Sequence, residues 1–352
     1  DFATAPFVTD AIRKRCENEV LGYTGKPDSY YNAIINWVKQ RYDLIVTKEV
    51  INFVPGIVPG IGMAMNCFTQ KGDKVMIQPP VYHPFAWVTT RNERTLVINP
   101  LRWENGMYRM DLDAFREQIK GCKLFILCNP HNPGGVVWTE AELRAIADIC
   151  YDEKVLVFSD EIHADLTLPP HTHRPFATVS EKARMNSVTF MSPSKAFNMP
   201  GLSASHALIF NEDLRKRFRI YMDAGELDMG HVFAFLSVEA AYSHGTEWLD
   251  QCLAYIQGNI DFVDEFLKKH APKIKAIRPE ASYLVWLDCR ELELSQKDLN
   301  EFFVDKAHLA LNDGEMFGKE GIGFMRLNVA SPRCIIEKAM KQLADAYQLY
   351  IK

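Results

Sequence analysis

The chain has 352 residues, of which 47% are hydrophobic, and its 40 basic and 45 acidic residues give a formal net charge of −5. This length and composition allow a large core and predict two domains or one large domain. The charges are well mixed, and we find no basic stripe, no apolar run of membrane-spanning length and no signal segment. The sequence therefore predicts no nucleic-acid partner and no membrane association.

The eight cysteines are scattered along the chain, and none form a Cys-x-x-Cys pair. Several lie in apolar strand or helix patterns, which indicates reduced structural thiols in a cytoplasmic protein. His171 and His173 could suggest a metal, but they follow two prolines and no cluster of further ligands surrounds them. The sequence favours a surface loop at these histidines over a metal site.

The first motif in chain order is the turn Pro55–Gly62, which precedes the apolar, helix-compatible segment Met63–Phe68. A glycine turn that leads into a helix offers free backbone N–H groups and a positive dipole end to a phosphate. The glycine spacing is not that of a dinucleotide-binding fingerprint. Strand Lys74–Gln78 follows and leads through two prolines to Tyr82. This tyrosine could stack on an aromatic ring, or it could be a packed surface residue.

A polar turn follows the apolar run Leu124–Cys128. This segment, Asn129–Gly135, contains two Asn-Pro steps and two glycines, which make a rigid turn that cannot continue a helix. The amide of Asn132 can then face a bound ligand, for example a phenolic oxygen or a carboxylate. A plain turn is the alternative interpretation.

An aspartate follows the next apolar run, Val155–Phe158, which is typical of a buried parallel strand. Ligands in open α/β sheets gather at the carboxyl ends of strands. At such a place Asp160 can pair with a pyridine nitrogen and keep it protonated, which makes the ring an electron sink. In isolation, a helix N-cap is an equally good interpretation of this aspartate.

A lysine follows the strand Ser187–Met191, directly behind the hydroxyls of Ser192 and Ser194. Lysine is costly to bury, and one reason to hold it at a strand end is chemical. An amine kept near neutrality can condense with a carbonyl to form a Schiff base. The flanking hydroxyls could hold a phosphate, so Lys195 points to pyridoxal phosphate, although the motif alone also fits a solvated loop.

The order of the elements predicts an α/β fold. Helical patterns separate the strand-like runs, as in the segment Thr139–Ala147, where Thr139 and Glu142 form a capping box. This alternation predicts a mostly parallel sheet with helices on both faces. The strand-like runs are Lys74–Gln78, Thr95–Asn99, Leu124–Cys128, Val155–Ser159, Ser187–Met191 and Ser205–Phe210.

The pattern changes at about Thr246. An amphipathic stretch, Glu247–His270, leads to strand-like segments around Ser282–Asp288 and Phe324–Val329. A second amphipathic helix, from Cys334 to about Tyr350, ends the chain. We therefore expect a smaller C-terminal α/β domain.

The order and spacing of these motifs resemble those of fold-type I pyridoxal-phosphate enzymes, the aspartate aminotransferase superfamily, over essentially the whole chain. Within it, the chain resembles the cystathionine β-lyase group of carbon–sulfur lyases typified by the MalY and PatB proteins. The residues that carry this likeness are Asp1–Pro6, Gly22–Thr24, Asp160–His163, Ser194–Asn198, Tyr283–Asp288 and Arg326–Asn328.

The resemblance implies a pyridoxal-phosphate transferase-like fold. The large cofactor-binding domain, with a mostly parallel seven-stranded sheet flanked by helices, would cover residues 21–246. Residues 1–20 and 247–352 would form the smaller domain. Relatives carry a further segment before Asp1 that helps to close the active site, so part of the substrate pocket is expected to depend on it.

The resemblance also implies a role for each motif. Lys195 would carry the cofactor covalently and move the Cα proton, and Asp160 would pair with the pyridine nitrogen. Asn132 would hold the ring oxygen with help from His163, which stands where aminotransferases usually have tyrosine. Tyr82 would stack on the ring.

Phosphate and substrate contacts are implied in the same way. The phosphate would be bound by Ser192, Ser194 and the backbone N–H groups of Ile57 and Val58. Tyr23 would reach the phosphate of the neighbouring subunit, which implies a homodimer with a shared active site. Arg326 would bind the substrate carboxylate with its two-pronged guanidinium, which lysine cannot reproduce.

Two positions depart from the superfamily pattern. Aspartate aminotransferases have an arginine on the phosphate eight residues after the lysine, where this chain has Ser203. This favours the lyase group over an aspartate-aminotransferase-like enzyme. The usual Asn-Pro-Thr-Gly segment has Gly134 in place of threonine, which we expect to affect loop stiffness more than chemistry.

The predicted function is β-elimination of L-cystathionine or another cysteine S-conjugate to pyruvate, ammonia and a thiol. A class I/II aminotransferase is the main alternative, because it needs the same residues for its early steps. A regulatory protein that retains the cofactor, with an undecided protein partner, is a third hypothesis. The presence of Lys195, Asp160 and Arg326 argues against a protein that has lost its catalytic activity.

Overall fold

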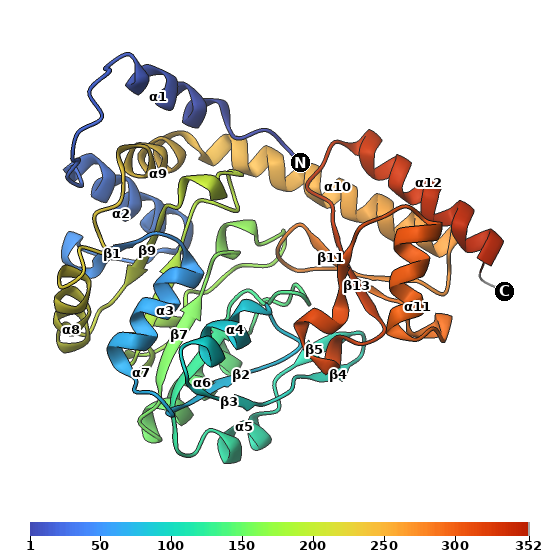
Figure 1. The fold of residues 1–352 in the computed structure, drawn as a ribbon, viewed down its shortest axis with the longest axis horizontal. Helices are drawn as coiled ribbons and strands as arrows, with labels where there is room; N and C mark the ends of the chain where they lie inside the picture. The colour runs from blue at the N-terminus through green and yellow to red at the C-terminus, as the bar shows by residue number, and fades with distance from the viewer. Residues whose placement is uncertain (351–352) are drawn as a thin grey trace.

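The computed structural model describes residues 1–350, and a large sheet lies at its centre (Figure 1). The strand order of this seven-stranded sheet is β1-β9-β8-β7-β6-β2-β3. Its strands are β1 (Ile51–Val54), β2 (Lys74–Ile77), β3 (Thr95–Ile98), β6 (Cys122–Cys128), β7 (Leu156–Asp160), β8 (Ser187–Met191) and β9 (Ser205–Leu208). Neighbours from β3 to β8 pair in parallel, and β9 pairs antiparallel with β8 and β1. The predicted mostly parallel seven-stranded sheet is confirmed.

The central strands are buried because helices cover both faces of the sheet. The helices are α1 (Pro6–Cys16), α2 (Asp28–Tyr42), α3 (Ile57–Phe68), α4 (Pro84–Arg91), α5 (Leu112–Gln118), α6 (Glu140–Asp152), α7 (Glu181–Met185), α8 (Glu212–Asp223), α9 (Val232–His244), α10 (Thr246–His270), α11 (Gln296–Glu301) and α12 (Arg333–Tyr350). The capping box at the start of α6 is confirmed: the Glu142 N–H donates to Thr139 Oγ1 at 3.2 Å, and the Thr139 N–H donates to the Glu142 carboxylate at 2.9 Å.

Two local predictions need correction. The helix expected to begin at Met63 begins at Ile57, because Pro59 lies in the first helical turn, where a backbone N–H donor is not needed. Gly60 then lets α3 approach the sheet, since an added Cβ would lie 2.9 Å from the Val54 side chain. The loop around the two histidines is not wholly exposed: His173 is buried, and its Nε2 lies 2.8 Å from the Glu161 carboxylate, which needs a partner once it is buried.

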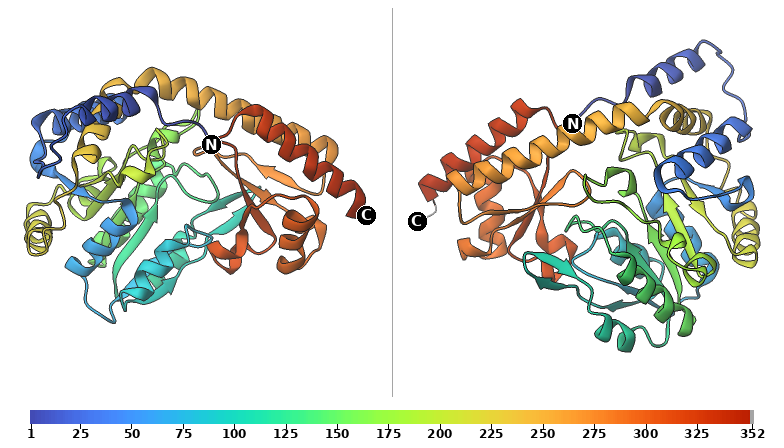
Figure 2. Two further views of the ribbon diagram at one scale, coloured as in Figure 1. Left: turned by 45° about the horizontal axis from the view of Figure 1, so that its top comes forward. Right: turned by 180° about the vertical axis from the view of Figure 1, so that it is seen from behind.

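A second sheet follows the long helix α10, which runs from beside the large sheet to this region (Figure 1 and Figure 2). Its antiparallel strand order is β10-β11-β13-β12. The strands are β10 (Lys275–Ile277), β11 (Leu284–Asp288), β12 (Asn312–Asp313) and β13 (Phe324–Asn328), and a separate hairpin joins β4 (Arg102–Glu104) to β5 (Met107–Arg109). The predicted smaller α/β region is therefore present.

The predicted domain limits, 21–246 and 1–20 with 247–352, stay a prediction, and residues 351–352 lie outside the described residues. Helix α1 lies beside α9, and the ring of its Phe7 meets that of Phe197 edge-on at 6.1 Å. One buried core continues from Trp37 through Leu253 to Val285 and thus links the large sheet's helices to the small sheet. No helix within residues 1–350 is both long and apolar enough to cross a membrane.

Candidate active site

A cavity of about 390 Å³ lies at the carboxyl ends of the central strands, between the large and the small sheet. Lys195, Asp160, Asn132 and Arg326 come from four separate segments of the chain and all line this cavity. The other predicted site residues that line it are Ile57, Val58, Tyr82, His163 and Ser194. The structure therefore brings most of the predicted site together, with Ser192 and Tyr23 as the exceptions.

Asp160 ends strand β7 and is only 3% exposed. The Ile162 N–H donates to its Oδ1 at 3.0 Å, and no side chain among residues 1–350 donates to this carboxylate. Burial raises the pKa of Asp160 to about 7, against the opposing effects of the Ile162 hydrogen bond and the Lys195 charge. A buried carboxylate with an open acceptor suits a cationic partner such as a protonated pyridine nitrogen.

Lys195 follows β8 and is half-buried in the same cavity. Burial lowers the pKa of its amine, the Arg326 charge lowers it further, and Asp160 partly opposes the shift. A larger share of neutral amine is what nucleophilic attack on a carbonyl, or proton removal from carbon, requires.

Arg326 on β13 presents its guanidinium to the cavity. Nη1 donates to Asn132 Oδ1 and Nη2 donates to Asn312 Oδ1, both at 2.8 Å, while Nε is buried without a partner. The guanidinium carbon lies 4.6 Å from the centre of the Phe317 ring. Burial lowers the pKa of Arg326 to about 10, so the group stays charged at neutral pH. A charged fork bound only to neutral amides can accept a carboxylate.

The start of α3 and Ser194 line the same part of the cavity. Ile57 and Val58 line the cavity, and their N–H groups, in the first helical turn, have no acceptor within the helix, which suits an anion. Ser192 lies behind them: it donates to the Ala204 carbonyl at 2.7 Å and accepts from the Ser194 N–H at 3.1 Å. This arrangement fixes the turn that presents Ser194, and a direct phosphate contact from Ser192 stays a prediction.

His163 and Tyr82 line the cavity with aromatic surface. His163 is buried with its Nδ1 unpartnered, and burial, together with the charges of Lys195 and Arg326, lowers its pKa to about 3. The ring is therefore neutral and has an open polar atom. Burial raises the pKa of Tyr82, so its hydroxyl stays protonated. The backbone N–H of Tyr82 donates to the backbone carbonyl of Asn132 at 3.0 Å. Tyr23 is 97% exposed and does not line the cavity.

Several residues that line this cavity are not predicted by the sequence. Asn312 lies on a two-residue strand with no motif around it, so no sequence signal could have found it. Tyr283 stood within a motif that carried the resemblance, but its side chain was not assigned. Glycine at position 134 is required by space and does not only affect loop stiffness. An added Cβ would lie 2.7 Å from the Tyr108 ring and 2.9 Å from His131.

The fold and the cavity together define a pyridoxal-phosphate-dependent enzyme. The open carboxylate of Asp160 fits the pyridine nitrogen, and the amine of Lys195 fits the aldehyde. The N–H groups of Ile57 and Val58 fit the phosphate. Within residues 1–350, Asp160 has no side-chain partner and Lys195 has no hydrogen bond or ion pair, so both groups are free to contact the cofactor.

Comparisons with known proteins identify the family of the chain. Residues 2–343 match the model of the family described as aminotransferase class I and II, and the chain belongs to this family. It is 37% identical over 348 residues to cystathionine beta-lyase PatB of Bacillus subtilis (strain 168), which covers 98% of this chain and 90% of that protein.

Two solved structures are similar over nearly the whole chain. A PLP-bound putative aminotransferase from Clostridium difficile 630 is 40% identical with a TM-score of 0.96, covering 98% of this chain and 90% of that one. A PLP-bound C-S lyase from Staphylococcus hominis is 34% identical with a TM-score of 0.92, covering 98% and 89%. The cofactor is pyridoxal 5′-phosphate, and the chain is an enzyme of the cystathionine β-lyase group.

Proposed function

We propose that the enzyme is a carbon–sulfur β-lyase of the cystathionine β-lyase type. It converts L-cystathionine or a related cysteine S-conjugate, with water, into pyruvate, ammonia and a thiol. The observation that carries the proposal is the convergence of Lys195, Asp160 and Arg326 on one cavity, in a chain that is 37% identical to a cystathionine β-lyase. Serine at position 203, where a phosphate-binding arginine would mark an aspartate aminotransferase, also supports it.

Arg326 binds the substrate α-carboxylate through its guanidinium, and one of its amide contacts, to Asn132 or Asn312, rearranges to admit the carboxylate. Lys195 Nζ takes the proton from Cα, as the lowered pKa of its amine favours. Asp160 in its ionised form holds a proton on the pyridine nitrogen. When bound, pyridoxal phosphate supplies the electron-withdrawing ring that lets the Cα–H bond break.

The same residues serve the elimination step. The electron pair of the broken Cα–H bond forms the Cα–Cβ double bond, and sulfur leaves as a thiolate with the electron pair of the Cβ–S bond. The three-carbon amine that results takes up water and gives pyruvate and ammonia. Arg326 keeps the carboxylate fixed during these changes, which keeps Cα within reach of Lys195.

We also propose a homodimer with a shared active site, in which Tyr23 contacts the cofactor phosphate of the neighbouring subunit. Tyr23 is 97% exposed, and the preceding apolar residues Val20 and Leu21 are 71% and 65% exposed. Consecutive exposed apolar side chains are typical of a surface that another chain covers. Sedimentation analysis of the wild type tests the assembly, and the affinity of Tyr23→Ala for pyridoxal phosphate tests the contact. A monomeric wild type would contradict both. A cytoplasmic location stays a prediction.

An aminotransferase is the second candidate, favoured by the 40% identical structure described as a putative aminotransferase. Incubation with L-cystathionine and no keto acid separates the two functions. We expect catalytic release of pyruvate and homocysteine in equal amounts. Turnover that begins only after a keto acid is added would overturn the lyase proposal.

A further inference from the structure

Two segments that hold predicted cofactor contacts are joined to each other beside the active-site cavity. The first, Gln78–Tyr82, follows β2 and ends at Tyr82. The second, Asn129–Gly135, follows β6 and contains Asn132. Tyr82 and Asn132 both line the cavity, so the relative position of the two segments decides how these side chains meet a bound cofactor.

Two hydrogen bonds of opposite direction join the segments, and we call them the linking hydrogen bonds. In the first, the backbone N–H of Tyr82 donates to the backbone carbonyl of Asn132 at 3.0 Å. In the second, His131 Nε2 lies 2.9 Å from the Pro80 carbonyl oxygen. A carbonyl oxygen can only accept, so Nε2 carries the proton and donates. Only this second bond depends on a side chain, because the first joins backbone atoms.

His131 is a costly side chain to bury at this place. It is 2% exposed, and its Nδ1 is buried without a partner among residues 1–350. Burial lowers the pKa of His131 to about 4, against the opposing effect of the hydrogen bond to Pro80, so the ring is neutral at neutral pH. An apolar ring could pack beside Tyr108 and Trp138 without an unpartnered nitrogen. The bond to Pro80 is what such a ring could not supply.

The two linked segments also reach the predicted substrate contact. Asn132 Oδ1 accepts from Arg326 Nη1 at 2.8 Å. The backbone N–H of Val81 donates to the Phe317 carbonyl at 2.9 Å, and the Phe317 ring lies 4.6 Å from the Arg326 guanidinium carbon. Since a misplacement of about 1 Å can cost about 100-fold in rate, a contact that fixes these segments matters even without touching a ligand.

We infer that His131 is a positioning residue: through Pro80 it fixes Asn132 and Tyr82 relative to each other, and so orients the cofactor. The inference goes beyond the proposed function, because a lyase and an aminotransferase need this orientation alike. It rests on the contacts expected for Asn132 and Tyr82. His131 does not line the cavity, so it acts through these two residues and not on a ligand.

The test follows the cofactor rather than turnover. His131→Phe keeps a flat ring but removes the donor, whereas His131→Gln keeps an N–H donor at a similar distance from the backbone. His206→Phe is the matched control, because His206 is 0% exposed on β9 and neither ring nitrogen has a partner within residues 1–350. For each protein we measure the dissociation constant of pyridoxal phosphate and the visible circular dichroism of the bound cofactor.

We expect His131→Phe to raise the dissociation constant of pyridoxal phosphate about tenfold, because one positioned hydrogen bond is lost. Its circular dichroism band should weaken, since a less firmly held cofactor samples more orientations. His131→Gln should restore the dissociation constant to within about threefold of the wild type, together with the band. The His206 control should change neither.

A His131→Phe protein with wild-type affinity and circular dichroism would overturn the inference, as would a His206 control that loses as much. If His131→Phe does not fold, His131→Asn replaces it, because this shorter side chain carries the same amide as glutamine but falls short of the Pro80 carbonyl. Equal behaviour of the Asn and Gln variants would then contradict the positioning role.

Pyruvate release from L-cystathionine is measured in parallel, which separates this inference from the proposed function. A wild type that releases no pyruvate, with the expected loss of cofactor affinity in His131→Phe, would refute the lyase and support the positioning role. Pyruvate release by the wild type, with unchanged cofactor binding in His131→Phe, would support the lyase and refute the positioning role.

Discussion

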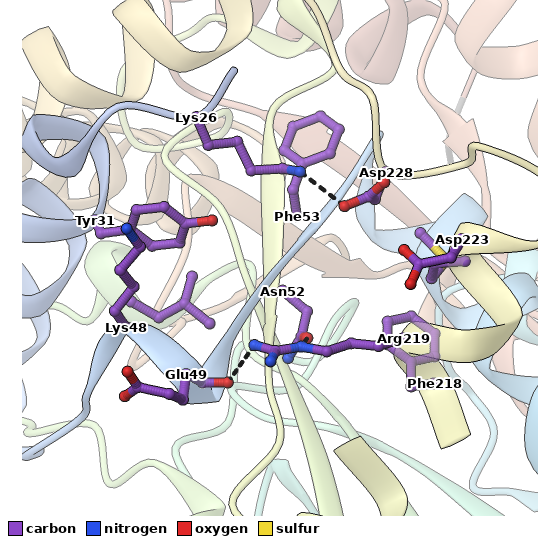
Figure 3. Close-up of a pocket in the computed structure, with 12 residues that line it drawn as sticks. Lys26, Tyr31, Lys48, Glu49, Asn52, Phe53, Phe218, Arg219, Asp223 and Asp228 are labelled. Atoms are coloured by element: carbon purple, nitrogen blue, oxygen red, sulfur yellow. Dashed lines mark hydrogen bonds and ion pairs between the residues drawn. The ribbon is translucent and has the colours of Figure 1, made fainter. Parts of the chain in front are cut away.

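Two cavities of nearly equal volume, about 390 and about 400 Å³, differ in how their charges are paired. The cavity of about 400 Å³ lies along edge strand β1, between α2 and α8 (Figure 3), and we call it the edge cavity. There Lys26 faces Asp228 at 2.7 Å, Lys48 pairs with Asp28 at 2.6 Å, and Arg219 Nη2 donates to the Glu49 carbonyl at 2.6 Å.

The active-site cavity leaves its charges open. Among residues 1–350, Asp160 has no side-chain donor, Lys195 has no hydrogen bond or ion pair, and Arg326 binds only neutral amides. Holding such groups partly out of water costs free energy, which the Ile162 N–H and the two amides offset only in part. Charge that is both buried and unpaired therefore distinguishes the active-site cavity from the other cavity, although the two volumes are nearly equal.

Removing the central amine should have the largest effect. Lys195→Ala is expected to lower the rate of pyruvate release by at least about 10³-fold, because the nucleophile and the proton-transfer group are lost together. Lys48→Ala, in the edge cavity, should leave the rate within about twofold, since its ion pair is exposed. Pyruvate is followed by a coupled dehydrogenase assay. Comparable losses of rate in both variants would contradict the assignment of the active site to the cavity that holds Lys195.

Asp160 should make the cofactor-free protein less stable as pH rises. Its carboxyl binds a proton up to about pH 7 in the folded chain, against an ordinary pKa of 3.8. The folded state then binds more protons than the unfolded state, so the stability from this group is lost as pH rises through 7. Between pH 5 and 8 we expect about 2 to 3 kcal/mol of lost stability that Asp160→Asn does not show.

Denaturant unfolding of both cofactor-free proteins at the two pH values measures this difference, because other titrating groups contribute equally to both. Identical pH dependence in the wild type and in Asp160→Asn would show that the carboxyl is not held protonated.

The planar guanidinium of Arg326 should contribute to catalysis through its shape as well as its charge. Arg326→Lys keeps the cation but loses the two-point contact with a carboxylate, so kcat/KM should fall about 10- to 100-fold. Arg290→Lys is the matched control in the same region, since Arg290 binds Asp288 through two hydrogen bonds and does not line the cavity. If kcat/KM of Arg326→Lys equals that of the control variant, Arg326 does not bind the substrate carboxylate.

Asn312 should act through the arginine rather than on the substrate. Asn312→Ala removes one neutral acceptor from Arg326, so KM should rise about three- to tenfold with kcat nearly unchanged. Asn312→Asp should raise KM further, because its charge competes with the substrate carboxylate for the guanidinium. A fall in kcat alone would indicate a different role.

The edge cavity should respond in stability alone. Arg219→Ala removes hydrogen bonds to Asn52 Oδ1 and to the Glu49 carbonyl, so the free energy of unfolding should fall by about 1 kcal/mol. Pyruvate release at 25 °C should stay unchanged. A large loss of activity without a loss of stability would show that this cavity also serves the reaction.

Much of the fold and site was predictable because the signals were local. Buried parallel strands produce apolar runs, and polar turns after those runs place Asn132, Asp160 and Lys195 at one edge of a sheet. Strand β1 was not predicted, because its residues, Ile51–Val54, form a run of four next to a turn and give little periodic signal. The start of α3 was misplaced because proline is acceptable in a first turn.

The order of most strands and helices, the chemistry of each turn and the family resemblance can be inferred from the sequence. Three facts cannot: Arg326 contacts Asn132, Asn312 supports that arginine, and Asp160 has no side-chain partner within residues 1–350. These facts depend on how two sheets pack and on which groups lose water, and such distances and desolvation are not local properties of the chain.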